Sequence, residues 1–269
     1  MKHIALDFRC LAFGGPDGSR VYGLVEEERV YVLVQAETEA HSLESIQWRF
    51  VGAALPLRSL TLPEGDISCI LNKAGEFTAM GAWNRTSSSV NRIRGLVYNP
   101  YNPDPPGSPP STRASWMRID VASNTDANEN EIAQLILETG EGNSLQVVLE
   151  ESRLTFRNLT GNGLTERNLH NIQQWNMSSR EYFGNNAQLR YSNNFLYSFN
   201  ADSNNAASLM KIPFVPNSAE LESPDATKLP LGATFIDITS TIGMCDWQEG
   251  YFTAVSGNEF FLLCQVQHS

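Results

Sequence analysis

The chain has 269 residues, of which 41% are hydrophobic and 18% are charged, and its formal net charge is −11. This length is sufficient for a large domain with a substantial apolar core. An acidic surface repels a phosphate backbone, and no basic patch offsets it, so we expect no nucleic-acid partner. No stretch approaches the roughly 18 apolar residues of a bilayer span, and we expect no membrane insertion.

The N-terminal segment MKHIALDFRCLAFGG lacks the pattern of a secretory signal. A single Lys is followed by Asp7 and Arg9, which interrupt the apolar region that a signal needs. We therefore expect an intracellular, cytoplasmic protein, or a chain from which such a segment has been removed.

Short runs of β-branched and aromatic residues alternate with clusters of Gly, Asn, Ser and Pro, a pattern typical of many short strands. In chain order, we predict hairpins at 21–37, 67–83, 145–160, 188–202 and 242–266, with further strands at 46–53, 172–178 and 208–215. Asn193 and Asn194 are predicted to form the turn of the fourth hairpin, because Asn tolerates positive φ.

Two segments far apart in the chain share one pattern, GEFTAMG (75–81) and GYFTAVS (250–256). We therefore searched for a longer repeat. Aligning the predicted second strand of each hairpin gives intervals of about 46, 77, 42 and 56 residues. The residues placed at equivalent positions are Tyr31, Phe77, Leu154, Leu196 and Phe252.

Two further features bear on this repeat. The longest interval contains the Pro-rich segment 99–115, which cannot join a strand ladder and is predicted to be a surface loop. The segments IQWRF, SWMRI and IQQWN each carry one tryptophan and are predicted to be another set of equivalent strands; these residues are Trp48, Trp116 and Trp175.

Units of about 40 to 55 residues with around four short strands each resemble the blades of a β-propeller. The WD40 and kelch signatures are absent, so the resemblance identifies no specific family. We predict an all-β fold, a β-propeller of about five four-stranded blades, formed as a single domain by residues 1–269. The propeller would have six blades if residues 131–149 contained an additional blade. Another all-β sandwich or barrel is the alternative.

The sequence gives no indication of a metal or cofactor site. The four cysteines are widely separated and lack C-x-x-C spacing, which predicts buried thiols while leaving a disulfide open. The segment DANENE (126–131) lacks the Gly and the final Glu of a calcium loop. The cysteines are Cys10, Cys69, Cys245 and Cys264, and the histidines, all in polar or terminal segments, are His3, His41, His170 and His268.

Asp7 in IALDF and Asp237 in FIDIT are candidate catalytic residues, because each carboxylate interrupts an apolar run. Both strands are predicted to open a blade and line the central channel. The resemblance implies that such carboxylates could act as nucleophile or base and as general acid, as in five-bladed glycosidases. The alternative is that each carboxylate only binds neighbouring backbone amides. We favour the alternative and expect the carboxyl groups to lie more than about 10 Å apart.

Aromatic residues in polar segments form the candidate binding surface: Tyr98, Tyr101, Tyr182 and Phe183. Such side chains stack on sugars and anchor protein interfaces, or simply hold their own loops against the protein body. Because no catalytic motif stands out, the main prediction is a non-enzymatic interaction or scaffold module that binds a protein partner through a propeller face or rim. The alternatives are a carbohydrate-binding, lectin-like propeller and a five-bladed glycosidase.

Overall fold

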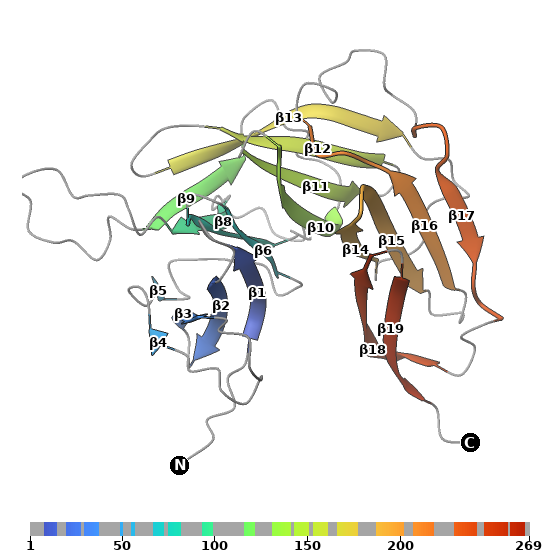
Figure 1. Cartoon of the computed structure of the whole chain (residues 1–269), viewed down its shortest axis with the longest axis horizontal. Helices are drawn as coiled ribbons and strands as arrows, with labels where there is room; N and C mark the ends of the chain where they lie inside the picture. Colours follow the sequence, from blue (N-terminus) through green and yellow to red (C-terminus); the bar gives the residue numbers. More distant parts are fainter. Residues whose placement is uncertain are drawn as a thin grey trace, which may run out of the picture.

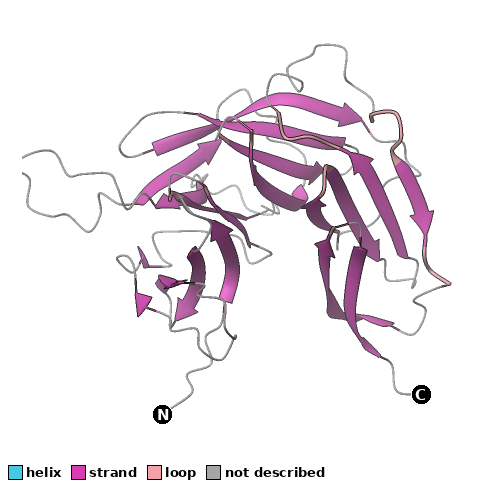
Figure 2. Cartoon of the chain, in the orientation of Figure 1, coloured by secondary structure: helices cyan, strands magenta, loops and turns pink. Residues whose placement is uncertain are grey.

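In the computed structural model, every regular element of the described residues is a β-strand, as Figure 2 shows. This confirms the prediction of an all-β fold. No helix in this part of the chain is long and apolar enough to cross a membrane. The described residues are 8–14, 20–27, 30–37, 49–50, 55–56, 67–72, 75–81, 93–98, 116–121, 131–140, 143–150, 153–160, 166–176, 187–201, 207–217, 229–240, 245–257 and 259–266.

The strands form three hydrogen-bonded sheets, of 13, 4 and 2 strands, in which we distinguish five consecutive units in chain order. Unit 1 consists of β1 (Phe8–Gly14), β2 (Arg20–Glu27), β3 (Val30–Glu37), β4 (Arg49–Phe50) and β5 (Leu55–Pro56). Unit 2 consists of β6 (Ile67–Leu71), β7 (Phe77–Gly81), β8 (Ile93–Tyr98) and β9 (Trp116–Val121). Unit 3 consists of β10 (Glu131–Glu138), β11 (Ser144–Glu150), β12 (Arg153–Thr160) and β13 (Glu166–Asn176). Unit 4 consists of β14 (Gln188–Ser192), β15 (Phe195–Ala201), β16 (Ala207–Pro213) and β17 (Thr234–Asp237), and unit 5 of β18 (Cys245–Ser256) and β19 (Glu259–Val266).

Each of the first four units is an antiparallel meander, in which strands that follow one another in the chain also pair in space. In unit 1 the short strands β4 and β5 both pair with β3. Unit 5 is a single antiparallel hairpin in the described part of the chain. The first strands of successive units begin 57 to 64 residues apart. This period is longer than the one of about 40 to 55 residues predicted from the sequence.

The first strands of neighbouring units lie side by side. β1 pairs in parallel with β6 through Gly14 and Leu71. The fourth strands of units 2 and 3, β9 and β13, pair in parallel. In each of these units the fourth strand is antiparallel to the first strand. The first strands β6 and β10 therefore run in the same direction. Contacts between β10 and β14, and between β14 and β18, continue this row of first strands.

Figure 1 shows the units arranged as an arc, with unit 1 and unit 5 at its two ends. Four-stranded antiparallel meanders whose first strands lie side by side are typical of the blades of a propeller, whereas a sandwich would stack two sheets face to face. The structure therefore has the predicted class, a propeller of five units, the fifth described as a hairpin. That all 269 residues form one domain stays a prediction.

The core lies between the units, because a single sheet can bury a face only against another layer. One large apolar cluster joins units 3 and 4, where the rings of Phe156, Trp175 and Phe214 lie 4.4 to 5.9 Å apart. A second cluster joins units 2 and 3 through Met80 and Ile136. Each sheet is therefore stabilised by its neighbours in the chain.

Several local predictions are confirmed. Asn193 and Asn194 connect β14 to β15 with φ angles of 51° and 63°, as expected for a two-residue hairpin turn. Gly75, in the turn between β6 and β7, has a φ of 82°. Trp116 and Trp175 both lie in fourth strands, β9 and β13. Trp48 lies outside the described residues.

The alignment of the two FTA segments is wrong. GEFTAMG lies mostly in β7, a second strand, whereas GYFTAVS lies in β18, the first strand of its unit. The difference arises because β18 continues through a register shift between Asp246 and Tyr251, so the segment aligned as a second strand is part of one long first strand. The aligned residues occupy third, second, third, second and first strands: Tyr31 in β3, Phe77 in β7, Leu154 in β12, Leu196 in β15 and Phe252 in β18.

Two segments were used to predict the number of blades, and the structure tests only one of these predictions. Residues 131–149 contain β10 and most of β11, the first two strands of unit 3, so they do not form a sixth blade. The Pro-rich segment 99–115 lies outside the described residues, and its assignment to a surface loop stays a prediction.

A disulfide connects the first strands of units 1 and 2. Cys10 of β1 is bonded to Cys69 of β6, with their Cα atoms 6.0 Å apart, so the prediction that these two are free thiols is wrong. The two backbones also approach closely at Gly14, where an added Cβ would lie 2.1 Å from the carbonyl oxygen of Leu71. Disulfides are typical of oxidising compartments, and the cytoplasmic location stays a prediction.

Replacing Cys10 with serine is expected to lower the free energy of unfolding, because the bond closes a loop with a sequence separation of 59 residues. The loop-entropy estimate for this length is about 4 kcal/mol. Chemical denaturation of Cys10→Ser, Cys69→Ser and the double variant measures the effect. All three variants lack the same single bond, so the free energy of unfolding should fall by the same amount in each. A decrease in the double variant equal to the sum of the two single decreases would contradict the bond.

Candidate functional site

The first strand of unit 3, β10, has one apolar face and one mixed face. Side chains alternate along a strand, so every second residue points to the same side. The apolar face belongs to the cluster that includes the aromatic side chains of units 3 and 4. Its members from β10 are Ala133, Leu135 and Leu137.

The opposite face of β10 lies against unit 2. The Gln134 side-chain nitrogen donates to the carbonyl oxygen of Met80 at 2.7 Å, and Ile136 N donates to Ser68 Oγ at 3.1 Å. Glu138 is two residues beyond Ile136 and therefore belongs to the same face. It is the last residue of β10 and is half-buried.

Unit 2 turns a corresponding face toward unit 3. Phe77 packs against Tyr22 of unit 1, with ring centroids 6.0 Å apart, so its neighbours in β7 point to the other side. Met80 on that side packs with unit 3. Alternation places Thr78 with Met80, and it places the buried Glu76, just before β7, with them.

Glu76 and Glu138 consequently lie at the same end of two neighbouring units, on faces that meet. β6 and β10 are parallel, and Glu76 follows the turn at the end of β6, whereas Glu138 ends β10. Hydrogen bonds within that turn hold Glu76: its amide donates to Asn72 Oδ1 at 2.8 Å, and Asn72 N donates to the Glu76 carbonyl oxygen at 3.0 Å. The sequence interpretation overlooked both glutamates, although each stands beside a turn at the end of a strand.

The turn after β10 is also fixed. Thr139 N donates to the carbonyl oxygen of Asn143 at 2.8 Å, and Asn143 N donates to Thr139 Oγ1 at 3.1 Å. Gly140 N donates to the carbonyl oxygen of Pro216 in unit 4 at 3.4 Å. The backbone beside Glu138 is therefore tied both to its own hairpin and to the next unit.

The interface between units 2 and 3 has a row of polar side chains beside its apolar cluster, and we call this row the polar seam. It consists of Glu76 and Thr78 from unit 2, and Gln134, Glu138 and Gln146 from unit 3. Thr78 Oγ1, Gln134 Oε1 and Gln146 Nε2 are buried without a hydrogen-bond partner in the described part of the chain. Burying such atoms costs free energy, so this interface is less favourable than the aromatic one between units 3 and 4.

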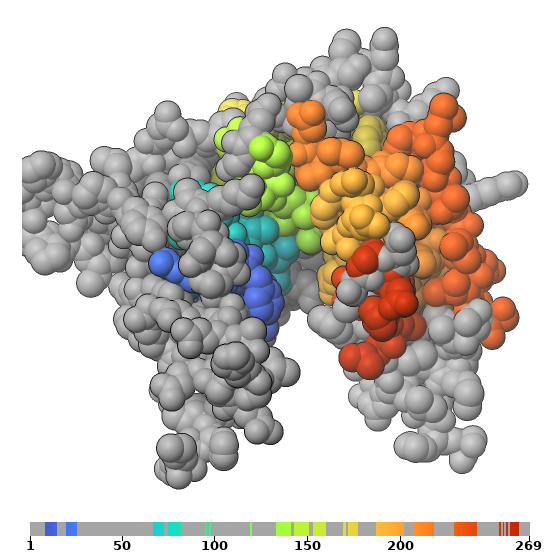
Figure 3. Space-filling model, in the orientation of Figure 1, coloured from blue at the N-terminus to red at the C-terminus, as the bar shows by residue number. Residues whose placement is uncertain are grey.

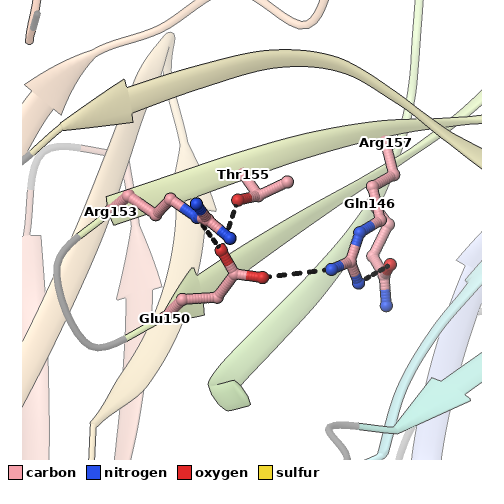
Figure 4. Close-up of polar contacts among 5 residues, drawn as sticks. All are labelled: Gln146, Glu150, Arg153, Thr155 and Arg157. Carbon is pink, nitrogen blue, oxygen red and sulfur yellow. Dashed lines mark hydrogen bonds and ion pairs between the residues drawn. The ribbon is translucent and has the colours of Figure 1, made fainter. Parts of the chain in front are cut away.

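A buried ionic network occupies the other end of the polar seam (Figure 4). Glu150, at the end of β11, accepts hydrogen bonds from Arg157 at 3.1 Å and from Thr155 Oγ1 at 2.6 Å. Arg153 Nε also donates to this carboxylate, and Arg157 contacts Gln146 Oε1 at 3.4 Å. Both Glu150 and Arg157 are only 1% exposed.

This network has the properties of a structural element. Burial lowers the pKa of Arg157 from its usual value, and the attraction of Glu150 opposes that shift. The Glu150 carboxylate interacts with two guanidinium groups and is closed to solvent, so it has no access to a substrate or to water. Acid–base chemistry in the polar seam would therefore fall to Glu76 and Glu138.

Asp237 does not lie where the sequence interpretation placed it. It ends β17, the fourth strand of its unit, so the expectation that its strand opens a blade is wrong. The apolar residues before it are exposed on this outer strand, Phe235 by 41% and Ile236 by 46%. Asp237 Oδ1 accepts a hydrogen bond from Thr239 N at 2.9 Å, and hydrogen bonding from Thr239 lowers the pKa of Asp237 below its usual value.

The structure does not bring the other predicted residues together. Asp7 lies outside the described residues, so its separation from Asp237 stays a prediction. Tyr98 ends β8 opposite Phe77, and nothing is described of its side chain. Tyr101, Tyr182 and Phe183 also lie outside the described residues, and the aromatic binding surface stays a prediction. Among the residues that are described, no group of three or more His, Cys, Asp or Glu could hold a metal ion.

Comparison with known proteins gives a distant structural likeness. No protein-family model and no curated protein sequence matches the chain. The chain resembles a solved GH43 glycoside hydrolase, described as an engineered enzyme with endo-xylanase and exo-arabinofuranosidase activity, at 10% sequence identity and a TM-score of 0.43. The match covers 87% of this chain and 41% of that structure.

This comparison contradicts the prediction of a non-enzymatic protein-interaction module, since the similar structure is a hydrolase and accords with the glycosidase alternative. A likeness at this level identifies neither a substrate nor active-site residues.

The ionic network leads to a prediction about stability. Glu150→Leu is expected to lower the free energy of unfolding by about 3 to 5 kcal/mol, because it leaves the Arg157 guanidinium buried without its main counterion. Glu150→Leu combined with Arg157→Met should recover most of that loss, since neither charge then remains. Denaturant unfolding of both variants tests this, with the exposed Glu259→Gln as control. If the double variant loses as much unfolding free energy as the two single substitutions together, Glu150 and Arg157 are not coupled.

Proposed function

We propose that the chain hydrolyses glycosidic bonds, with Glu76 and Glu138 as its two reacting carboxylates. The observation that supports this is their common position. Both lie at the same end of parallel first strands or the adjoining turn, on the facing sides of units 2 and 3. Hydrolysis of a glycosidic bond by the usual routes requires two carboxyl groups on either side of one bond.

The two side chains have different surroundings, as their two roles would require. One carboxyl group protonates the leaving oxygen, and the other attacks the sugar carbon or activates a water molecule. Glu76 is only 7% exposed and is held by its turn, whereas Glu138 is half-buried at the end of a strand. Both are therefore held by backbone elements whose positions are set by hydrogen bonds.

The buried polar groups of the polar seam also favour this proposal. An interface that keeps the unpartnered polar atoms of Thr78, Gln134 and Gln146 costs stability, and such violations are expected near functional sites. The equivalent interface between units 3 and 4 is packed with aromatic and aliphatic side chains. A carbohydrate is accordingly the partner that we propose for the polar seam.

Replacing either glutamate with glutamine should reduce hydrolysis at least about 100-fold, since a positioned acid or base contributes that much or more. The wild-type chain is first assayed on aryl glycosides of hexoses and pentoses. Glu76→Gln and Glu138→Gln are then assayed on the best substrate, with Glu259→Gln as a control on an exposed strand. Thermal unfolding of each variant confirms that the fold is retained.

Two results would contradict the proposal. One is a wild-type chain that hydrolyses none of these glycosides, in which case sugar binding without turnover would favour the lectin-like alternative. The other is a folded glutamine variant at position 76 or 138 that keeps more than about a tenth of the wild-type rate, since loss of a reacting group costs more than this.

A further inference from the structure

Two motifs for N-linked glycosylation, N-x-S/T, begin in unit 3. Asn158 begins NLT in β12, and Asn176 begins NMS at the end of β13. A third such motif begins at Asn84, outside the described residues. The motif also occurs by chance, so the surroundings of each asparagine decide whether it can be an acceptor.

Asn176 lies on the outermost strand of its unit. It is the last residue of β13 and is exposed. One edge of β13 pairs with β12, whereas in the described part of the chain the other edge pairs with β9 only at residues 166–169. Trp175 is buried in the aromatic cluster, so alternation directs Asn176 to the opposite, exposed side of the strand. Figure 1 shows β13 along the upper edge of the molecule, where Figure 3 shows yellow atoms of this strand at the surface.

Asn158 has very different surroundings. It lies inside the sheet, between Leu145 of β11 and His170 of β13. Leu145 is fully buried, and Asn158 Oδ1 is itself buried without a hydrogen-bond partner among the described residues. A glycan is bulky and requires a position at the surface. The folded unit therefore has no room for a glycan on Asn158.

The disulfide is an independent observation about the compartment of the protein. Cys10 and Cys69 lie in units 1 and 2, outside the unit that contains these two motifs, and they are bonded to each other. Disulfides form and persist in the endoplasmic reticulum and outside the cell. The N-x-S/T motif is an acceptor in proteins that pass through the same compartments. The bond therefore favours a location in which an exposed motif is modified.

We propose that the native protein carries an N-linked glycan on Asn176 and none on Asn158. In the transfer, the side-chain nitrogen of Asn176 forms a bond to the anomeric carbon of an oligosaccharide, and the bond from that carbon to a lipid diphosphate breaks. The lipid diphosphate leaves, and the amide nitrogen loses one proton. This proposal departs from the expected cytoplasmic location, and it does not depend on the proposed hydrolysis of glycosidic bonds.

The glycan would be attached far from Glu138 within unit 3. β10 and β13 run in opposite directions, because each strand of this unit is antiparallel to the next. Glu138 ends β10 and Asn176 ends β13, so the two residues lie at opposite ends of the unit. The bulky, solvated glycan therefore begins at the end of the unit away from this glutamate.

Mass spectrometry of the protein isolated from its native source tests the proposal. Trypsin separates the two motifs into peptides 158–167 and 168–180, because arginines precede and end both peptides. Peptide N-glycosidase in heavy-oxygen water converts a glycosylated Asn to an Asp that carries the label. We expect this label on Asn176 in most copies of its peptide and no label on Asn158. A digest without the glycosidase controls for spontaneous deamidation.

Two variants of the chain secreted from a eukaryotic cell provide the matched control. Ser178→Ala removes the motif and should abolish the label on Asn176, whereas Ser178→Thr preserves the motif and should keep the label. An unlabelled Asn176 in the native protein or in Ser178→Thr would overturn the proposal, as would a label on Asn158 in the folded protein. A label that persists in Ser178→Ala would also overturn it, because the label would then arise without the motif.

Discussion

The structure depends on one constraint, which is that a four-stranded meander cannot bury both of its faces alone. A unit covers a face only by packing against a neighbouring unit, and the chain places the first strands of successive units side by side. The disulfide between Cys10 and Cys69, the contact of Ile136 N with Ser68 Oγ, and the aromatic cluster around Phe156 all lie at these junctions.

The junctions between units differ in the side chains that line them. The apolar junction contributes to stability, whereas the polar seam contains the residues to which we assign a function. The interface of units 3 and 4 is apolar and has aromatic rings in contact. The polar seam between units 2 and 3 has a closed ionic network around Glu150 at one end and the pair of Glu76 and Glu138 at the other. The network holds charged groups of unit 3 in contact, while the two glutamates that we propose to react lie at the ends of strands or in the adjoining turn.

The sequence predicted strands and turns well because their signals are local. Asn193 and Asn194 form the expected turn, and Trp116 and Trp175 mark equivalent fourth strands. The order of strands within a unit was harder, since Asp237 follows apolar residues that lie on an exposed outer strand. The pairing of Glu76 with Glu138 that we propose depends on contacts between units, and neither local periodicity nor spacing contains that information.

The central claim is that the two glutamates of the polar seam form one site. The most direct test is the separation of the Glu76 and Glu138 carboxyl groups in a crystal structure of the chain. The account predicts a separation in the range of paired catalytic carboxylates, from about 5 to about 9.5 Å. Carboxyl groups more than about 10 Å apart, beyond that range, would contradict it.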